Sequence, residues 1–108
     1  MTFNEYQKQA ITTKIYKTED ALAYVTLGIA GEAGEVAEKV KKIIRDDDSI
    51  VSGQKRVEIS KELGDVLWYI AAMCEELGLD FNKVAEENIQ KLQSRKDRGQ
   101  LTGSGDNR

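Results

Sequence analysis

The segment from residue 21 to residue 45 repeats apolar side chains at the period of an α-helix. Residues 54–77 repeat the pattern, and no proline interrupts any part of the 108-residue chain. Strand-like alternation is absent, so the chain is expected to be all-α. Its length suits a single, four-helix-bundle-like domain. We expect this domain to oligomerise through its helix faces. The two apolar stripes comprise Leu22, Val25, Ile29, Val36, Val40 and Ile43, and Ile59, Leu63, Val66, Ile70, Met73 and Leu77.

Polar and glycine-containing breaks divide the chain. Residues 45–53 form a polar segment that ends in glycine, Gly78 stops the third helix, Asp80 caps the fourth, and the fourth ends near Gly99. The expected helices cover residues 3–16, 21–45, 54–77 and 81–99. One domain is therefore expected over residues 1–99, followed by a disordered tail at 100–108.

Composition excludes several function classes. The net charge is −3 with both signs interspersed, so duplex nucleic acid is not an expected partner. No apolar run reaches membrane-spanning length and the polar start is not a signal peptide, which favours a soluble, cytoplasmic protein with no membrane partner. The chain has no histidine and one cysteine, Cys74, in an apolar run. The chain therefore lacks the histidine and cysteine residues that a structural zinc site, a Cys-His dyad or a Ser-His-Asp triad needs. An enzyme with this composition would depend on carboxylates, amines, guanidinium groups and a hard metal ion.

Several carboxylates lie at the margin of the apolar stripes. Placed about 100° apart, Glu32 falls about 50° from the centre of its stripe and Glu35 about 110°, whereas Glu38 points away and is expected to be solvated. In the next helix Glu62 lies about 70° from the centre and Asp65 about 130°. Packing the two stripes together would gather Glu32, Glu35, Glu62 and Asp65, with Glu58 and Tyr69 continuing the line.

Carboxylates brought together in this way repel one another, and a divalent cation resolves the conflict. Oxygen ligands suit Mg²⁺, with Mn²⁺ as a substitute. Gly31, Gly34 and Gly64 would leave room beside the acids. Since Mg²⁺ often takes further ligands from substrate phosphates, a phosphorylated substrate is expected.

The fourth helix carries possible phosphate-binding groups. Asn88 lies inside its apolar stripe, with Lys91 and Arg95 on the same side. Together they form a line of donors suited to phosphate oxygens. Alternatively, the amide makes a core hydrogen bond and the two basic residues form a solvated face.

Two motifs resemble those of a known enzyme family. GEAGE at 31–35 and ELGD at 62–65, within LGIAGEAGEVAEKVKK and ELGDVLWYIA, resemble the paired acidic motifs of the MazG-like nucleoside triphosphate pyrophosphohydrolases, members of the all-α NTP pyrophosphatase superfamily. ENIQKLQSRKDRG resembles the Asn-x-x-Lys-Leu-x-x-Arg segment of that family. The likeness covers residues 3–99. It implies Mg²⁺-dependent cleavage of a nucleoside triphosphate between its α- and β-phosphates, giving the monophosphate and pyrophosphate.

The resemblance also implies roles for individual residues. Glu32, Glu35, Glu62 and Asp65 match the acids that bind the metal, and Glu32 or Glu35 would orient or deprotonate the attacking water. Gly31 stands where the fuller motif has its first glutamate. The matched donors of the fourth helix, Asn88, Lys91 and Arg95, would contact the phosphates or sugar.

Apolar residues outside the main stripes indicate a second subunit. Such residues are Ala23, Leu27, Ala30 and Ala37 in the segment 21–45, and Leu67, Trp68 and Ala71 in the segment 54–77. They favour a homodimer or a tetramer made of two dimers, as in the resembled family. Trp68 either lines a base pocket or packs in the core or the interface, and Gln7 and Tyr6 are further candidates for base recognition.

The resemblance favours house-cleaning hydrolysis of a dNTP or non-canonical nucleotide, and another pyrophosphate-linked metabolite is a further candidate substrate. The alternative is a non-catalytic regulatory or adaptor module whose acids hold a passive cation. A di-iron carboxylate bundle is disfavoured because it usually needs Glu-x-x-His.

Overall fold

The computed structural model describes residues 1–108 and contains four α-helices and no strand, which confirms an all-α single domain. None of the helices combines the length and apolar character that a membrane crossing requires. The elements are α1 (Phe3–Ala10), the 3₁₀ turns η1 (Ile11–Thr13) and η2 (Thr18–Asp20), α2 (Ala21–Asp46), α3 (Gly53–Glu76) and α4 (Phe81–Asp97).

The first helix is shorter than the predicted 3–16. It ends at Ala10 because the β-branched residues that follow have a local alternative to the helix. The Thr12 hydroxyl donates to the Gln9 carbonyl at 2.6 Å, and the Thr13 hydroxyl donates to the Ala10 carbonyl at 2.7 Å. The chain then tightens into η1 and becomes extended at Lys14, so residues 11–16 lie beside α3 and do not continue the helix.

The other helix boundaries follow their caps. The side chain of Ser52 accepts the Lys55 N–H at 3.1 Å, and that of Asp80 accepts the Lys83 N–H at 3.0 Å, which satisfies donors at the starts of α3 and α4. Gly78 follows α3 with φ of 65°, a left-handed conformation that glycine adopts without strain.

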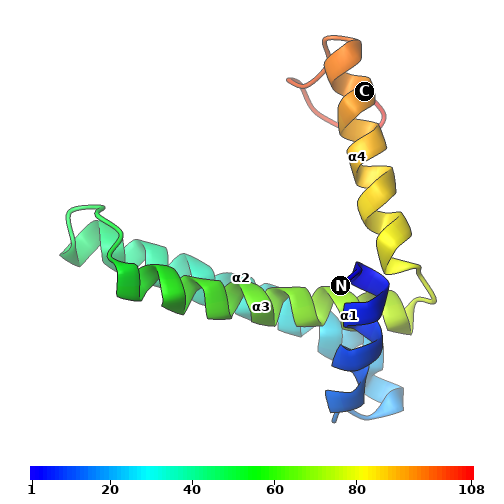
Figure 1. The fold of residues 1–108 in the computed structure, drawn as a ribbon, viewed down its shortest axis with the longest axis horizontal. Helices are drawn as coiled ribbons and strands as arrows, with labels where there is room; N and C mark the ends of the chain where they lie inside the picture. Colours follow the sequence, from blue (N-terminus) through cyan, green and yellow to red (C-terminus); the bar gives the residue numbers. More distant parts are fainter.

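The helices form an open arrangement (Figure 1). α2 and α3 run antiparallel as a long hairpin, α1 crosses the end of α3, and α4 projects away from that end. Phe81 anchors the start of α4, buried with its ring centroid 4.7 Å from that of Phe3. α4 packs against α1 and not along the hairpin, so one chain does not by itself close the expected bundle.

The buried core is small and lies where the hairpin meets α1. One cluster contains Tyr16, Ala21, Val25 and Ala72, and a second contains Ala71, Cys74 and Phe81. The radius of gyration is 16.8 Å, against about 13 Å for a compact domain of this length. The accessible surface of 7832 Å² is about 1,800 Å² larger than a compact monomer of this mass exposes. Many large apolar side chains are therefore uncovered in one chain, among them Leu27, Val57, Leu63 and Ile89.

Residues 100–108, the tail, contain no helix or strand and fold back on α4. The buried Arg95 guanidinium donates to the Asp106 carbonyl at 2.8 Å and to the Gly105 carbonyl at 3.3 Å. The disorder expected for this segment stays a prediction.

Candidate metal centre

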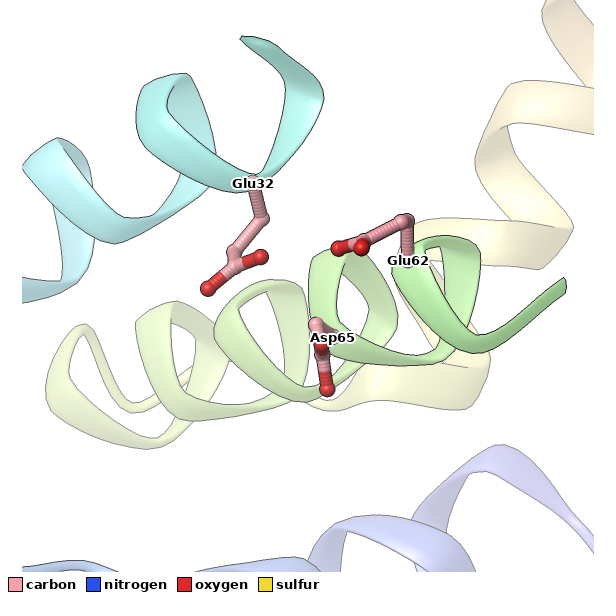
Figure 2. Close-up of side chains that lie close together, drawn as sticks. All are labelled: Glu32, Glu62 and Asp65. Atoms are coloured by element: carbon pink, nitrogen blue, oxygen red, sulfur yellow. The ribbon is translucent and has the colours of Figure 1, made fainter. Parts of the chain in front are cut away.

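Three carboxylates from the two helices of the hairpin converge. One oxygen each of Glu32 on α2 and of Glu62 and Asp65 on α3 lie within 4.8 Å of one another. Figure 2 shows Glu32 reaching from α2 toward Glu62, with Asp65 one turn further along α3. We call these three residues the acid cluster. Its geometry follows from the packing of the two apolar stripes, because the E-x-x-E and E-x-x-D spacings put acids at facing margins.

Electrostatic repulsion acts on the centre of the cluster. Partial burial raises the pKa of Glu32 above its ordinary value of 4.5, and the charges of Asp65, Glu62 and Glu35 raise it further. A group in that environment is stabilised either by a proton or by a cation. Because the converging donors are all carboxylate oxygens, the cluster fits a hard divalent cation such as Mg²⁺ or Mn²⁺.

Glu35 and Glu38 lie outside the group of converging oxygens. Glu35 is exposed, although its charge contributes to the raised pKa of Glu32. Its assignment as a fourth ligand stays a prediction. Glu38 is solvated as expected, since its carboxylate is half exposed and pairs with Lys41 at 3.0 Å.

A lysine contacts the acid cluster. Lys39 of α2 lies with its Nζ 3.5 Å from Glu62 Oε1, and the side chains keep only 28% and 18% of their exposure. Sequence reasoning missed this residue. Lys39 follows Glu32 by seven residues, close to two helical turns, so the helical period does place the two on the same side of α2.

An aromatic hollow of about 280 Å³ adjoins the acid cluster. The Tyr16 and Tyr24 rings stack with centroids 5.0 Å apart, and Trp68 meets Tyr69 edge to face at 5.0 Å. Aromatic walls of this kind suit a flat, partly apolar group. The hollow is lined by Thr13, Ile15, Tyr16, Tyr24, Glu32, Asp65, Trp68 and Tyr69.

Hydrogen bonds hold the wall of the hollow in place. The Tyr16 hydroxyl donates to Glu76 Oε1 at 2.7 Å, and the Trp68 indole N–H donates to the Thr13 hydroxyl at 2.9 Å and to the Ala10 carbonyl at 3.2 Å. Trp68 thus combines a structural contact with a place in the wall. Its role toward a substrate stays a prediction.

Two further candidates for base recognition lie elsewhere. The buried Gln7 amide donates to the Ala71 carbonyl at 3.2 Å, and neither Gln7 nor Tyr6 lines the aromatic hollow. Tyr6 lines a larger hollow of about 410 Å³ between α1, α3 and the start of α4. None of the acid cluster borders that space, so the aromatic hollow is the better substrate candidate.

One glycine has a clear structural reason. A Cβ at Gly28 would overlap the Tyr69 ring, so the hydrogen at this position lets the ring lie across α2 beside the acid cluster. A Cβ at Gly31, Gly34 or Gly64 would meet nothing within 4 Å. These three glycines leave open space along the hairpin, and no contact within one chain requires them.

The predicted phosphate-binding residues of α4 lie apart from the acid cluster, on the helix that projects from the hairpin (Figure 1). Asn88 and Lys91 are exposed on α4, whereas Arg95 is buried beneath the tail. Lys91 Nζ lies 3.5 Å and Arg95 Nη2 lies 3.7 Å from Asp106 Oδ1. Within one chain, Lys91 and Arg95 therefore contact a carboxylate of the tail, whereas Asn88 is exposed and does not lie in the core.

Comparisons with known proteins agree with the paired motifs. The family model for the MazG nucleotide pyrophosphohydrolase domain matches residues 20–99, the part of the chain that spans α2, α3 and α4. The chain is 48% identical over 109 residues to Gene 37 protein of Mycobacterium phage L5, covering 95% of this chain and 96% of the phage protein. No solved structure matches. The chain belongs to the family of MazG nucleotide pyrophosphohydrolase domains.

Proposed function

We propose that the protein hydrolyses a nucleoside triphosphate between its α- and β-phosphates, releasing the nucleoside monophosphate and pyrophosphate. The observation that carries the proposal is the acid cluster at the edge of an aromatic hollow, with Glu32 and Asp65 belonging to both. The hollow suits a nucleobase and the carboxylates suit a cation that binds phosphates. A dNTP or a non-canonical nucleotide is the proposed substrate, removed in a house-cleaning role.

The metal site comprises Glu32, Glu35, Glu62 and Asp65, with Mg²⁺ as the cofactor and Mn²⁺ as its substitute. When bound, such an ion neutralises charge on the phosphate oxygens and makes a coordinated water more acidic. The convergence of oxygens from α2 and α3 supports this site. Glu35 lies one turn beyond Glu32 and is the more exposed of the two.

Glu32 and Glu35 act on the attacking water. A carboxylate that accepts the proton of this water must be charged and must keep an oxygen free of the metal. Glu32, which borders the aromatic hollow, and Glu35, one turn further along α2, are the carboxylates that we assign to this role. To Glu35, which is exposed, we assign the orienting of the water or the sharing of its proton. The water oxygen bonds to a phosphorus of the α–β anhydride as the bridging P–O bond breaks, its proton passes to the carboxylate, and the monophosphate and pyrophosphate separate.

Trp68, Tyr24 and Tyr69 bind the base. Stacking on such rings contributes about 1–3 kcal/mol per base and discriminates weakly between bases, because every base has a flat face. The half-buried rings of Trp68 and Tyr69 and the more exposed ring of Tyr24 all line the hollow, which supports this assignment.

A second copy of the chain completes the site with its α4. Asn88 and Lys91 bind phosphate or sugar oxygens from there, and Arg95 joins them when Asp106 releases it. The excess surface of about 1,800 Å² per chain is more than the roughly 800 Å² per partner that a standard interface buries. A homodimer, or a tetramer of two dimers, would cover the exposed apolar side chains of the hairpin and α4.

The test is a panel of canonical and modified nucleoside triphosphates incubated with the protein and Mg²⁺, with products separated by ion-exchange chromatography. We expect equimolar monophosphate and pyrophosphate from at least one nucleotide, and no turnover with EDTA. Diphosphate and inorganic phosphate as products would contradict cleavage at the α–β bond. No turnover on the whole panel, together with Mg²⁺ binding, would instead favour a non-catalytic module with a passive cation site.

A further inference from the structure

The ion pair between Lys39 and Glu62 differs from the other helix-surface pairs of the hairpin. Its side chains are 28% and 18% exposed, whereas those of the Lys41–Glu38 pair are 60% and 52% exposed. The Lys39 pair also joins α2 to α3, while Lys41 and Glu38 lie on the same helix. Because Glu62 belongs to the acid cluster, Lys39 and a divalent cation both use the same carboxylate.

The aromatic hollow and Lys39 lie toward opposite ends of the acid cluster. On α2, Tyr24 precedes Glu32 by eight residues, about 12 Å along the helix, and Lys39 follows it by seven, about 10 Å. On the antiparallel α3, Tyr69 lies beyond Asp65 while Lys39 contacts Glu62. Along the hairpin, the side chains therefore change from the aromatic rings of the hollow to the carboxylates and then to an ammonium group.

This order fixes how an extended nucleotide would lie. A base in the hollow puts the sugar and α-phosphate beside Glu32 and Asp65, which border the hollow. The outer phosphates then run toward Glu62 and Lys39. An ammonium group that loses Glu62 to a divalent cation is left without an anionic partner, and phosphate oxygens are the nearest that the substrate offers.

We propose that Lys39 binds the pyrophosphate portion of the substrate and competes with the divalent cation for Glu62. This rests on the proposed function and adds a direction to it: the pyrophosphate product lies at the Lys39 end of the acid cluster. The Lys39 ammonium group binds the negatively charged oxygens of the pyrophosphate portion and does not contact the monophosphate portion.

The test compares Lys39→Met with wild type, with Lys39→Arg as the charge-preserving variant and Lys41→Met as the matched control. Mn²⁺ binding without nucleotide is followed by electron paramagnetic resonance. We expect Lys39→Met to bind Mn²⁺ about fivefold more tightly, since an ion pair of about 1 kcal/mol no longer opposes binding. Lys41→Met is expected to bind as wild type does.

Calorimetry then measures binding of inorganic pyrophosphate and of a nucleoside monophosphate in the presence of Mg²⁺. Lys39→Met should lose about tenfold in pyrophosphate affinity, the scale of a hydrogen bond to a charged group, and should keep its monophosphate affinity. Lys39→Arg should retain most of the pyrophosphate affinity. Circular dichroism checks that each variant is folded.

The outcomes separate the two proposals. Equal pyrophosphate affinities in Lys39→Met and wild type, or an equal loss for both ligands, would overturn the role of Lys39 while nucleotide hydrolysis by wild type leaves the proposed function intact. Unchanged Mn²⁺ affinity in Lys39→Met would overturn the competition for Glu62. A wild-type protein that neither binds Mn²⁺ nor hydrolyses any nucleotide would refute both proposals together.

Discussion

Replacing Glu32 by glutamine should stabilise the metal-free protein. Because burial and neighbouring acids raise the folded-state pKa of Glu32 above 4.5, its protonated form contributes stability that is present below that value and is lost as the pH rises through the raised pKa. At pH 7.5 the charge of Glu32 therefore opposes folding, and the neutral amide of Glu32→Gln removes this opposition.

The magnitude follows from the spacing of the acid cluster. Two unit charges 4.8 Å apart repel by about 0.9 kcal/mol at the dielectric constant of water and by about 3.5 kcal/mol at a value of 20. Glu32 is partly exposed and Lys39 offsets some of the charge, so we expect about 1 kcal/mol. In a domain of this size that raises the Tm by about 5 °C.

Thermal unfolding in low-salt buffer at pH 7.5, with EDTA or with Mg²⁺, measures the effect. Mg²⁺ at tenfold its Kd adds about 1.4 kcal/mol to a protein that binds it, so wild type should gain stability with Mg²⁺ and Glu32→Gln should gain much less. With Mg²⁺, the difference in Tm between Glu32→Gln and wild type therefore becomes smaller or changes sign. Glu38→Gln, whose parent carboxylate is solvated and paired with Lys41, serves as the control. A Glu32→Gln protein that is no more stable in EDTA and gains as much from Mg²⁺ as wild type would refute the reasoning.

Three further predictions concern the packing at Gly28, the hydrogen bonds of Trp68 and the pH dependence of metal binding. Gly28→Ala should lower the free energy of unfolding by about 1–3 kcal/mol because the new methyl group displaces the Tyr69 ring. Gly34→Ala, in open space, should raise it by up to about 1 kcal/mol. Urea unfolding measures both free energies, and equal effects of the two substitutions would contradict the packing of Tyr69 against Gly28. Trp68→Phe removes the indole N–H that donates to Ala10 and Thr13, and should lower the free energy of unfolding by about 1–3 kcal/mol, measured by urea unfolding. Steady-state kinetics should show a raised KM for the nucleotide. An unchanged KM would show that Trp68 does not bind the substrate. Mn²⁺ affinity should fall as the pH is lowered toward the raised pKa of Glu32, since protons compete with the cation, and a calorimetric affinity independent of pH between 5 and 8 would contradict this.

Periodicity predicted the hairpin well because its signals are local. The stripes in residues 21–45 and 54–77 correspond to α2 and α3, and the spacing of Glu32, Glu62 and Asp65 along these stripes agrees with their convergence. Two long antiparallel helices can pack in few ways once the apolar face of each is known. The positions of the side chains at the margins of those faces can then be predicted.

The end of α1, the direction of α4 and the surroundings of the acid cluster depend on contacts that periodicity does not specify. The threonine hydroxyls that end α1 early act on individual carbonyls, and they create the loop that walls the aromatic hollow. The direction of α4 depends on its anchoring through Phe81. Tyr24 and Lys39 lie on the same side of α2 as Glu32, but their roles emerge only when α3 supplies Tyr69 and Glu62 across from them.

The most direct measurement is turnover of the preferred nucleotide by variants in which one acid is neutralised. Wild type and Glu38→Gln should release monophosphate and pyrophosphate in equal amounts with Mg²⁺. Glu35→Gln and Asp65→Asn should keep their helical circular dichroism and lose activity by about 100-fold or more. Wild-type turnover in both of these variants would contradict the proposal that acids from the two helices of the hairpin jointly bind the catalytic cation.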